Sequence, residues 1–181
     1  MTSRATCHRA GLVLALVIAG CGYSTRSLLP PAYRTIYVEP FVNKLPITGE
    51  TTELRRFATS LPRLEEDVTN GVINRFIFDG SLRVTPRKGE ADLILTGELV
   101  DFHRQPLRLD DSGNVEEYRL NLVVNATLRN EEGNLLWEEP ELIGDTTYFV
   151  TGSLSKTEVT AGDALVTDVA RRLVERTIEN W

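Results

Sequence analysis

Few residues of this 181-residue chain belong to the types that form or break covalent bonds. The chain has two cysteines and two histidines, and His103 is the only histidine beyond the first 20 residues. A serine nucleophile would need a histidine and an acid beside it, and no GxSxG turn is present. His103 adjoins Arg104 in a segment that we expect to form an exposed hairpin. We therefore interpret it as a solvated histidine and predict no catalytic residue.

Acidic residues are numerous, but their spacing does not suit a metal ion or acid–base chemistry. Asp110, Asp111 and Asn114 are too few and too closely spaced for a calcium loop, and such residues are typical of a turn. Adjacent carboxylates on a strand point to opposite faces, so they cannot act together. The adjacent pairs are Glu65-Glu66, Glu116-Glu117, Glu131-Glu132 and Glu138-Glu139. We predict a protein without metal, cofactor or enzymatic activity.

Cys21 is the residue for which the sequence predicts a definite reaction. It ends the tetrapeptide Ile18-Ala19-Gly20-Cys21, which follows an apolar run and the positive charges of Arg4 and Arg9. The apolar run of about nine residues would span only about 14 Å as a helix, whereas a membrane span needs roughly 20 residues. Its length is that of a secretory signal. The tetrapeptide resembles the bacterial lipobox, so we predict a signal peptide over residues 1–20 and lipidation of Cys21.

Lipidation would fix the location of the protein. Two or more acyl chains hold a protein stably on a membrane, whereas one holds it only marginally. Gly22 rather than Asp follows the cysteine, and in bacterial lipoproteins this implies the outer membrane, here on its periplasmic side. Cleavage would also remove Arg4 and Arg9, which changes the net charge from −6 to −8. With no basic cluster, nucleic acid is not an expected partner.

The remaining chain shows a helix period in two places and a strand period in several. Residues 21–33 read as a lipidated N-terminus and tether, and 34–181 as one periplasmic domain. We expect strands at 35–41, 82–84, 91–102, 118–128, 135–137 and 146–150, a hairpin connection at 105–114, and helices at 62–79 and 157–180. This order predicts an α+β fold in which two helices pack on one face of a small, mostly antiparallel four-to-five-stranded sheet.

The ordered motifs along the chain resemble the lipopolysaccharide-assembly lipoprotein family LptE. The N-terminal motifs are Cys21-Gly-Tyr-Ser24, Thr35-Ile-Tyr-Val38 with Phe41 and Asn43, Leu64-Glu-Glu-Asp-Val-Thr-Asn70, Phe76-Ile-Phe-Asp-Gly80 with Leu82 and Val84, and Ala91-Asp92 leading to Gly97-Glu98. The C-terminal motifs are Glu117-Tyr-Arg119, Leu136-Trp-Glu138, Tyr148-Phe-Val-Thr-Gly152 and a closing helix that runs to Trp181. Each motif alone is weak, and their order on one lipoprotein is what makes the resemblance specific.

The resemblance implies a function in outer-membrane assembly. A member of this family sits as a plug in the outer-membrane β-barrel LptD, helps the barrel fold, and contacts lipopolysaccharide on its way to the outer leaflet. It is not an enzyme. Contact with this anionic glycolipid is attributed to basic side chains, and the best local candidates here are Arg104 and Arg108 beside the predicted hairpin. They would have to form a local basic patch against an overall negative charge.

Two other classes of protein stay open at this stage. The segment Thr35-Ile-Tyr-Val-Glu-Pro-Phe41 followed by Asn43 also resembles the first strand of periplasmic scaffold lipoproteins of the CsgG and LpoB kind. Those proteins form a secretion pore or activate a cell-wall synthase, and they usually carry a longer or glycine-rich segment that this chain lacks. A lipid-anchored hydrolase is the third class, and it would depend on His103.

Overall fold

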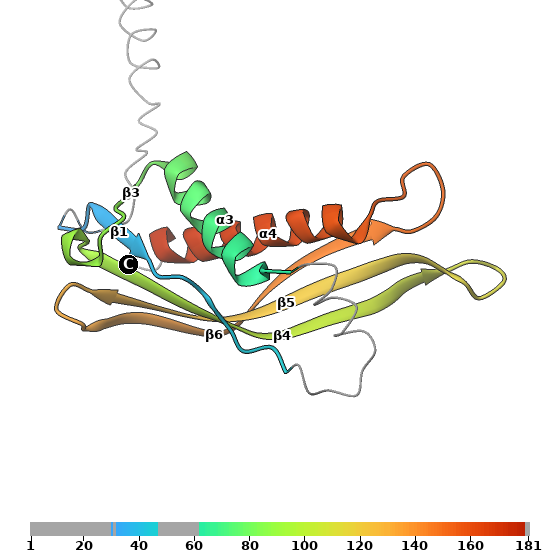
Figure 1. Ribbon diagram of the computed structural model, residues 1–181, viewed down its shortest axis with the longest axis horizontal. Helices are drawn as coiled ribbons and strands as arrows, with labels where there is room; N and C mark the ends of the chain where they lie inside the picture. The colour runs from blue at the N-terminus through green and yellow to red at the C-terminus, as the bar shows by residue number, and fades with distance from the viewer. Residues whose placement is uncertain (1–29, 31, 47–61, 180–181) are drawn as a thin grey trace, which may run out of the picture.

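The computed structural model describes Pro30, residues 32–46 and residues 62–179. Two helices lie above one long, twisted sheet (Figure 1). The strands are β1 (Thr35–Val38), β2 (Val42–Asn43), β3 (Arg83–Val84), β4 (Leu93–Leu109), β5 (Val115–Asn130) and β6 (Leu135–Phe149), and the helices are α3 (Leu64–Asp79), the short 3-10 helix η1 (Lys88–Glu90) and α4 (Glu158–Glu179). The predicted α+β fold, with both long helices on one face, is confirmed.

The sheet is larger and more mixed than the sequence suggested. It contains six strands in the order β3-β1-β4-β5-β6, and β2 also pairs with β4. The long strands β4, β5 and β6 are antiparallel, whereas β1 pairs in parallel with both β3 and β4. Parallel pairs need a crossover connection. Helix α3 lies in the connection between β1 and β3, so the short strands β1 and β3 can run side by side in the same direction.

The helical periodicity correctly identified the buried faces of both helices. In α3 the buried side chains recur every four residues, at Leu64, Val68, Val72 and Phe76. In α4 the main buried row is Ala161, Leu165, Val169 and Leu173. These rows pack against the alternate residues of β4 and β5 that point to the same face, which are Leu93, Leu95, Leu99, Leu120, Leu122, Val124 and Leu128. Hydrophobic burial between helices and sheet is therefore the main stabilising contribution.

Glycine residues mark where the backbone approaches a neighbour or reverses. Gly80 ends α3 in the left-handed conformation, with φ of 77°, and donates its N–H to the carbonyl of Phe76. At Gly144 in β6, an added Cβ would lie 2.2 Å from a methyl carbon of Val169 and 3.2 Å from that residue's Cα and N. Helix α4 thus crosses β6 at a position that has no room for a side chain.

The strands β4, β5 and β6 run further than predicted. The expected connection at 105–114 narrows to Asp110–Asn114, because β4 continues through Pro106 to Leu109. The two segments expected at 135–137 and 146–150 are parts of one strand, β6, which contains a bulge around Pro140 and Glu141. As a result the sheet extends beyond the helices as a long hairpin (Figure 1).

Candidate functional site

The predicted lipidation site, Cys21, lies outside the described residues, so its acylation stays a prediction. The described domain starts close behind it, where Tyr33 N–H donates to the Pro30 carbonyl at 3.0 Å. Within the described part of the chain, no helix combines the length and apolar character that crossing a bilayer requires.

Arg104 lies on the helix-facing side of β4, and its side chain is only 12% exposed. Its Nε–H donates to the Tyr148 hydroxyl at 3.1 Å, and the same nitrogen is 3.9 Å from a carboxylate oxygen of Glu158. The guanidinium carbon lies 3.7 Å from the centre of the Tyr118 ring. Arg104 therefore connects β5 and β6 with the first residue of α4.

The aromatic partners of Arg104 are packed against each other. The rings of Tyr118 and Tyr148 stack with their centres 5.9 Å apart and an angle of 26° between their planes. Burial raises the pKa of the Tyr148 hydroxyl, and the positive charge of Arg104 acts against that rise. The raised pKa keeps the Tyr148 hydroxyl neutral in the ordinary pH range, so Tyr148 offers a neutral acceptor to Arg104.

Arg108 lies on the opposite face of the sheet from Arg104. A regular strand would place positions 104 and 108 on the same face, but the register shifts between Pro106 and Arg108 and leaves Leu107 without a cross-strand partner. The Arg108 side chain is 60% exposed, with its Nε 4.0 Å from Glu117 and its guanidinium 5.7 Å from the centre of the Phe149 ring. The structure thus does not bring the two candidate arginines together.

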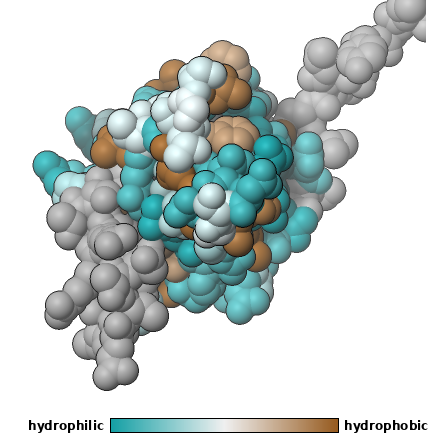
Figure 2. Space-filling view, turned by 90° about the vertical axis from the view of Figure 1, so that its right-hand side faces the viewer, coloured by the Kyte–Doolittle hydropathy of each residue, from teal (hydrophilic) through white to brown (hydrophobic). Residues whose placement is uncertain are grey.

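We call the end of the molecule that carries Arg108 the distal end, comprising the β4–β5 hairpin, the loop between β6 and α4, and the first turn of α4. Its exposed large apolar side chains are Leu107, Leu109, Leu154 and Val159. Figure 2 faces this end and shows hydrophobic side chains interspersed among hydrophilic ones. Exposed apolar side chains next to a cation are typical of a surface that meets an amphipathic ligand or a membrane.

The hairpin at the distal end is held by its own turn. One carboxylate oxygen of Asp110 accepts hydrogen bonds from the backbone N–H of Ser112 and Asn114, each at 2.8 Å. The other accepts from the Asn114 side chain at 3.0 Å, and these bonds hold the pKa of Asp110 below its usual value. Asp110 and Asn114 therefore form the turn, as the sequence predicted.

Arg119 was not singled out as a candidate from the sequence, although the alternation in its segment predicted that it points outward. It is exposed, and it lies two residues along β5 from Glu117, opposite Gln105 and Thr147. Since alternate residues of a strand share a face, Arg119 lies on the same face of the sheet as Arg108. The two arginines flank Glu117 there.

His103 lies within β4 rather than at its end. Its side chain is 49% exposed, and its Nε2 is 3.1 Å from a carboxylate oxygen of Asp101. Among the described residues no group of three or more histidine, cysteine or acidic side chains is arranged to hold a metal ion. The contact with Asp101 is an exposed pair on the rim of the sheet.

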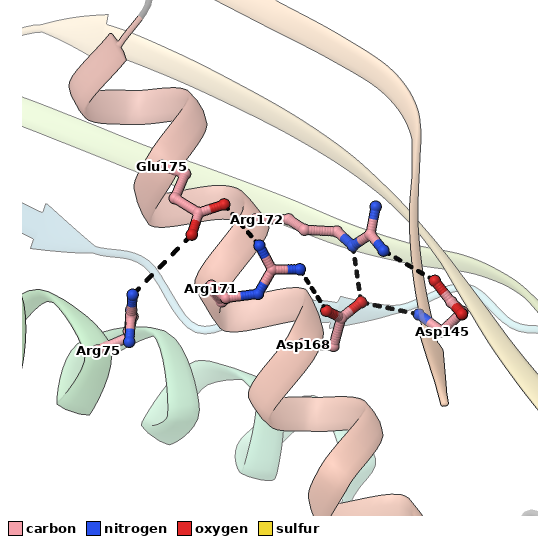
Figure 3. A network of polar contacts seen from close by, with 6 residues as sticks. All are labelled: Arg75, Asp145, Asp168, Arg171, Arg172 and Glu175. Carbon is pink, nitrogen blue, oxygen red and sulfur yellow. Dashed lines mark hydrogen bonds and ion pairs between the residues drawn. The ribbon is translucent and has the colours of Figure 1, made fainter. Parts of the chain in front are cut away.

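Helix α4 is fixed to the edge of the sheet by a network of ion pairs (Figure 3). Asp168 accepts hydrogen bonds from the backbone N–H of Asp145 in β6 at 2.9 Å, from Arg171 at 2.6 Å and from Arg172 at 2.7 Å. Arg172 also donates to the Asp145 side chain at 2.8 Å. Partial burial raises the pKa of Asp168, but these hydrogen bonds outweigh it and hold the pKa below its usual value.

The network also protects an open strand. β6 is an edge strand, and an edge strand presents unpaired backbone groups to any neighbouring strand. The carboxylate of Asp168 satisfies one such N–H, and Arg176 reaches Glu139 of the same strand at 2.5 Å. The network therefore fixes the angle between α4 and the sheet on which the distal end is built.

The fold and the distal end define an α+β domain that presents one amphipathic end beyond its helices. The chain belongs to the lipopolysaccharide-assembly family LptE, whose family model matches residues 33–179. This family consists of non-enzymatic assembly lipoproteins, so the protein is in general terms a lipoprotein of lipopolysaccharide assembly.

Solved structures are similar to this chain at low sequence identity. The hypothetical protein CT253 from Chlamydia trachomatis is 14% identical with a TM-score of 0.51, over 82% of this chain and 98% of its own. An uncharacterized lipoprotein B from Nitrosomonas europaea is 15% identical with a TM-score of 0.48, over 83% and 84%. The rare lipoprotein B from Shewanella oneidensis is 14% identical with a TM-score of 0.42, over 79% and 94%. No curated protein matches the sequence.

Proposed function

We propose that this protein is an outer-membrane lipoprotein, anchored through Cys21 on the periplasmic side, that partners an LptD-type β-barrel. In this role it supports assembly of the barrel and takes part in delivering lipopolysaccharide to the outer leaflet. Membership of the LptE family over residues 33–179 is the observation that carries the proposal. The lipobox-like tetrapeptide that ends at Cys21 supports the anchor.

The distal end is the surface that we assign to the glycolipid. Lipopolysaccharide combines acyl chains with phosphate groups, so a binding surface needs apolar side chains next to a cation. Leu107 and Leu109 are 46% and 56% exposed, and Arg108 between them is 60% exposed. Arginine suits a phosphate because its guanidinium can donate two parallel hydrogen bonds. The carboxylate of Glu117 lies 4.0 Å from Arg108, so it would compete with the phosphate of the ligand for the guanidinium.

The two candidate arginines receive different roles in this proposal. Arg108 contacts the glycolipid directly, because its guanidinium reaches solvent. Arg104 positions the hairpin, because its guanidinium is occupied by Tyr118, Tyr148 and Glu158. A reversal of charge at Arg108 should therefore weaken glycolipid binding without loss of stability, whereas the same change at Arg104 should act on both.

Depletion of the protein and a charge reversal test this function. Depletion in the native host should lower the amount of correctly assembled barrel and weaken the barrier of the outer membrane to bulky apolar compounds. Arg108→Glu should reduce binding of purified lipopolysaccharide to the acylated protein several-fold, with barrel level unchanged. Lys88→Glu is the matched control, because it also reverses the charge of an exposed side chain but lies far from the distal end. Unchanged barrel level and barrier after depletion would refute the partner, and unchanged binding by Arg108→Glu would refute the site.

A further inference from the structure

A second exposed apolar surface lies at the opposite end of the molecule, where α3 ends. Ile77 and Phe78 occupy the last turn of α3, and 64% and 81% of their surfaces are exposed. The guanidinium of Arg75 lies 5.5 Å from the centre of the Phe78 ring and supports it from the side of the helix. An aromatic ring this exposed has little contact with the core, so folding of the domain does not account for it.

This surface lies where the chain arrives from its N-terminus. Three residues after Gly80 the chain enters β3, and β3 pairs with the first residues of β1, Thr35 with Arg83. Figure 1 shows the end of α3, β3 and β1 gathered at the same end of the molecule, which we call the proximal end.

The start of β1 is fixed in place at the proximal end. The carboxylate of Asp92 accepts hydrogen bonds from the backbone N–H of Arg34 at 2.8 Å and of Thr35 at 2.9 Å, and from the Thr35 hydroxyl at 2.9 Å. These bonds hold the pKa of Asp92 below its usual value, the bond from Arg34 most of all, so the carboxylate is charged at neutral pH. The point from which the tether leaves the domain is therefore rigid.

The length of the tether limits the distance from the proximal end to the membrane. Pro30 is the ninth residue after Cys21, and a fully extended chain covers at most about 3.5 Å per residue, or about 30 Å in all. β4 alone, with 17 residues, is about 55 Å long. An anchor on Cys21 thus keeps the proximal end near the bilayer and leaves the distal end free to reach much further.

We infer that Ile77 and Phe78 at the end of α3 dip into the bilayer that holds the lipid anchor, as a second, non-covalent membrane contact. The inference rests on the acylation of Cys21 proposed above. Aromatic and apolar side chains at the end of a helix are suited to the boundary between headgroups and acyl chains. Arg83, exposed at the start of β3, places a positive charge on the same end, where it would face phosphate groups.

A comparison within the same end of the molecule favours this surface over its neighbour. Leu135 is also exposed at the proximal end, but it follows the turn that contains Glu131 and Glu132. Two adjacent carboxylates would be repelled by anionic headgroups, whereas Phe78 adjoins a single carboxylate, Asp79, which accepts a hydrogen bond from the Ser81 N–H at 3.1 Å. The lipid contact is therefore confined to α3 and does not extend to the β5–β6 turn.

Site-specific photocrosslinking in cells can test the contact. The full-length acylated protein would carry the photoreactive aromatic p-benzoylphenylalanine at position 78 or, as control, at position 154. Leu154 is 69% exposed and lies at the distal end, where the proposed ligand is lipopolysaccharide and not phospholipid. Substitution of one exposed aromatic residue for another at position 78 leaves the core untouched. After irradiation, adducts are identified by mass spectrometry. We expect phospholipid adducts from position 78 at a yield at least fivefold above that from position 154.

Each alternative result overturns the inference. Adducts from position 78 to a protein alone would mean that the end of α3 docks on a partner, and an absence of adducts would mean that it faces water. Equal phospholipid adducts from positions 78 and 154 would mean that the contact is not confined to the proximal end. Failure of the proposed function is distinguishable, because depletion would then leave barrel level and barrier intact while position 78 still yields lipid adducts.

Discussion

The guanidinium carbon of Arg104 lies 3.7 Å from the centre of the Tyr118 ring, on the strand that pairs with its own. Because the same side chain binds Tyr148 and faces Glu158, one arginine joins three strands to the start of α4. One carboxylate oxygen of Glu158 is buried without a hydrogen-bond partner among the described residues. The positive charge of Arg104, 3.9 Å away, offsets its negative charge. We therefore assign Arg104 a role in the stability of the fold.

Replacing Arg104 by alanine should lower the free energy of unfolding by about 1–3 kcal/mol, because a hydrogen bond and a cation–π contact are lost and the partly buried carboxylate of Glu158 loses its counter-charge. Arg104→Lys should restore little of this, since an ammonium cannot both stack on Tyr118 and reach Tyr148 with a planar group. Urea unfolding is the measurement. Arg108→Ala, at a 60% exposed side chain, is the control and should change stability by less than about 0.5 kcal/mol. Equal losses at both positions would contradict the assignment of roles.

The contact between Gly144 and Val169 gives a second prediction. Gly144→Ala should destabilise the protein by about 1–3 kcal/mol, because the added methyl group would force α4 away from β6. Combining it with Val169→Ala removes the methyl carbon at 2.2 Å but leaves the helix backbone at 3.2 Å. The double variant should therefore cost less than the sum of the single variants, in a double-mutant cycle measured by urea unfolding. Gly89→Ala is the control, because an added Cβ there would meet open space. Strictly additive losses of stability in the double variant would argue against a close contact between α4 and β6.

The ion-pair network predicts how stability depends on pH. The pKa of Asp168 in the folded protein lies below its ordinary value near 3.8, so the folded state binds fewer protons than the unfolded state in that range. Its contribution to stability is present above about pH 4 and is lost as the pH falls through the pKa of the folded protein. Asp168→Asn should lower stability at pH 7 by about 1–3 kcal/mol and flatten the decline below pH 4. Asp163→Asn is the control, because Asp163 is exposed on the same helix. In thermal melts from pH 2 to 7, this variant should show the same dependence of stability on pH as the wild type.

The elements predicted correctly from the sequence are those in which a single periodicity runs without interruption. The rows Val68–Val72–Phe76 in α3 and Leu165–Val169–Leu173 in α4 are buried as expected. Hydrophobic spacing at the helix period reflects burial directly, so no tertiary information was needed. The clean alternation around Leu122 likewise identified the buried face of β5.

Other features depend on contacts between distant residues and could not be predicted from local patterns. Pro140 and Gly144 look like loop residues, yet both lie within β6. Pro140 is tolerated because the bulge places it outside the ladder, where Glu141 N–H bonds to the Asn125 side chain instead. Gly144 is required by Val169, which is 25 residues further along the chain.

The candidate site was predicted only in part for the same reason. The sequence placed Arg104 and Arg108 beside one hairpin, and both lie in β4 at its distal part. The bulge at Leu107 then turns them to opposite faces, and a bulge of one residue leaves no mark in the hydrophobic pattern. Whether a basic residue is exposed or buried against aromatic rings depends on that single shift.

The last prediction concerns Cys21, on which the location of the protein depends. Cys21→Ser should abolish acylation and leave an uncleaved precursor, because the peptidase that removes the leader of a lipoprotein acts on the lipid-modified cysteine. Cys7→Ser, within the leader, is the matched control, since it removes the other cysteine of the chain and leaves Ile18-Ala19-Gly20-Cys21 intact. Metabolic labelling with a fatty acid reports acylation, and gel mobility reports cleavage. The wild type and Cys7→Ser should incorporate label and migrate as the mature form, whereas Cys21→Ser should do neither. Because a nine-residue apolar run is too short to span a membrane stably, the precursor should also be released more readily from membranes by carbonate washing. Normal labelling, cleavage and membrane retention of Cys21→Ser would show that another residue anchors the protein and would remove the basis for placing its proximal end at the bilayer.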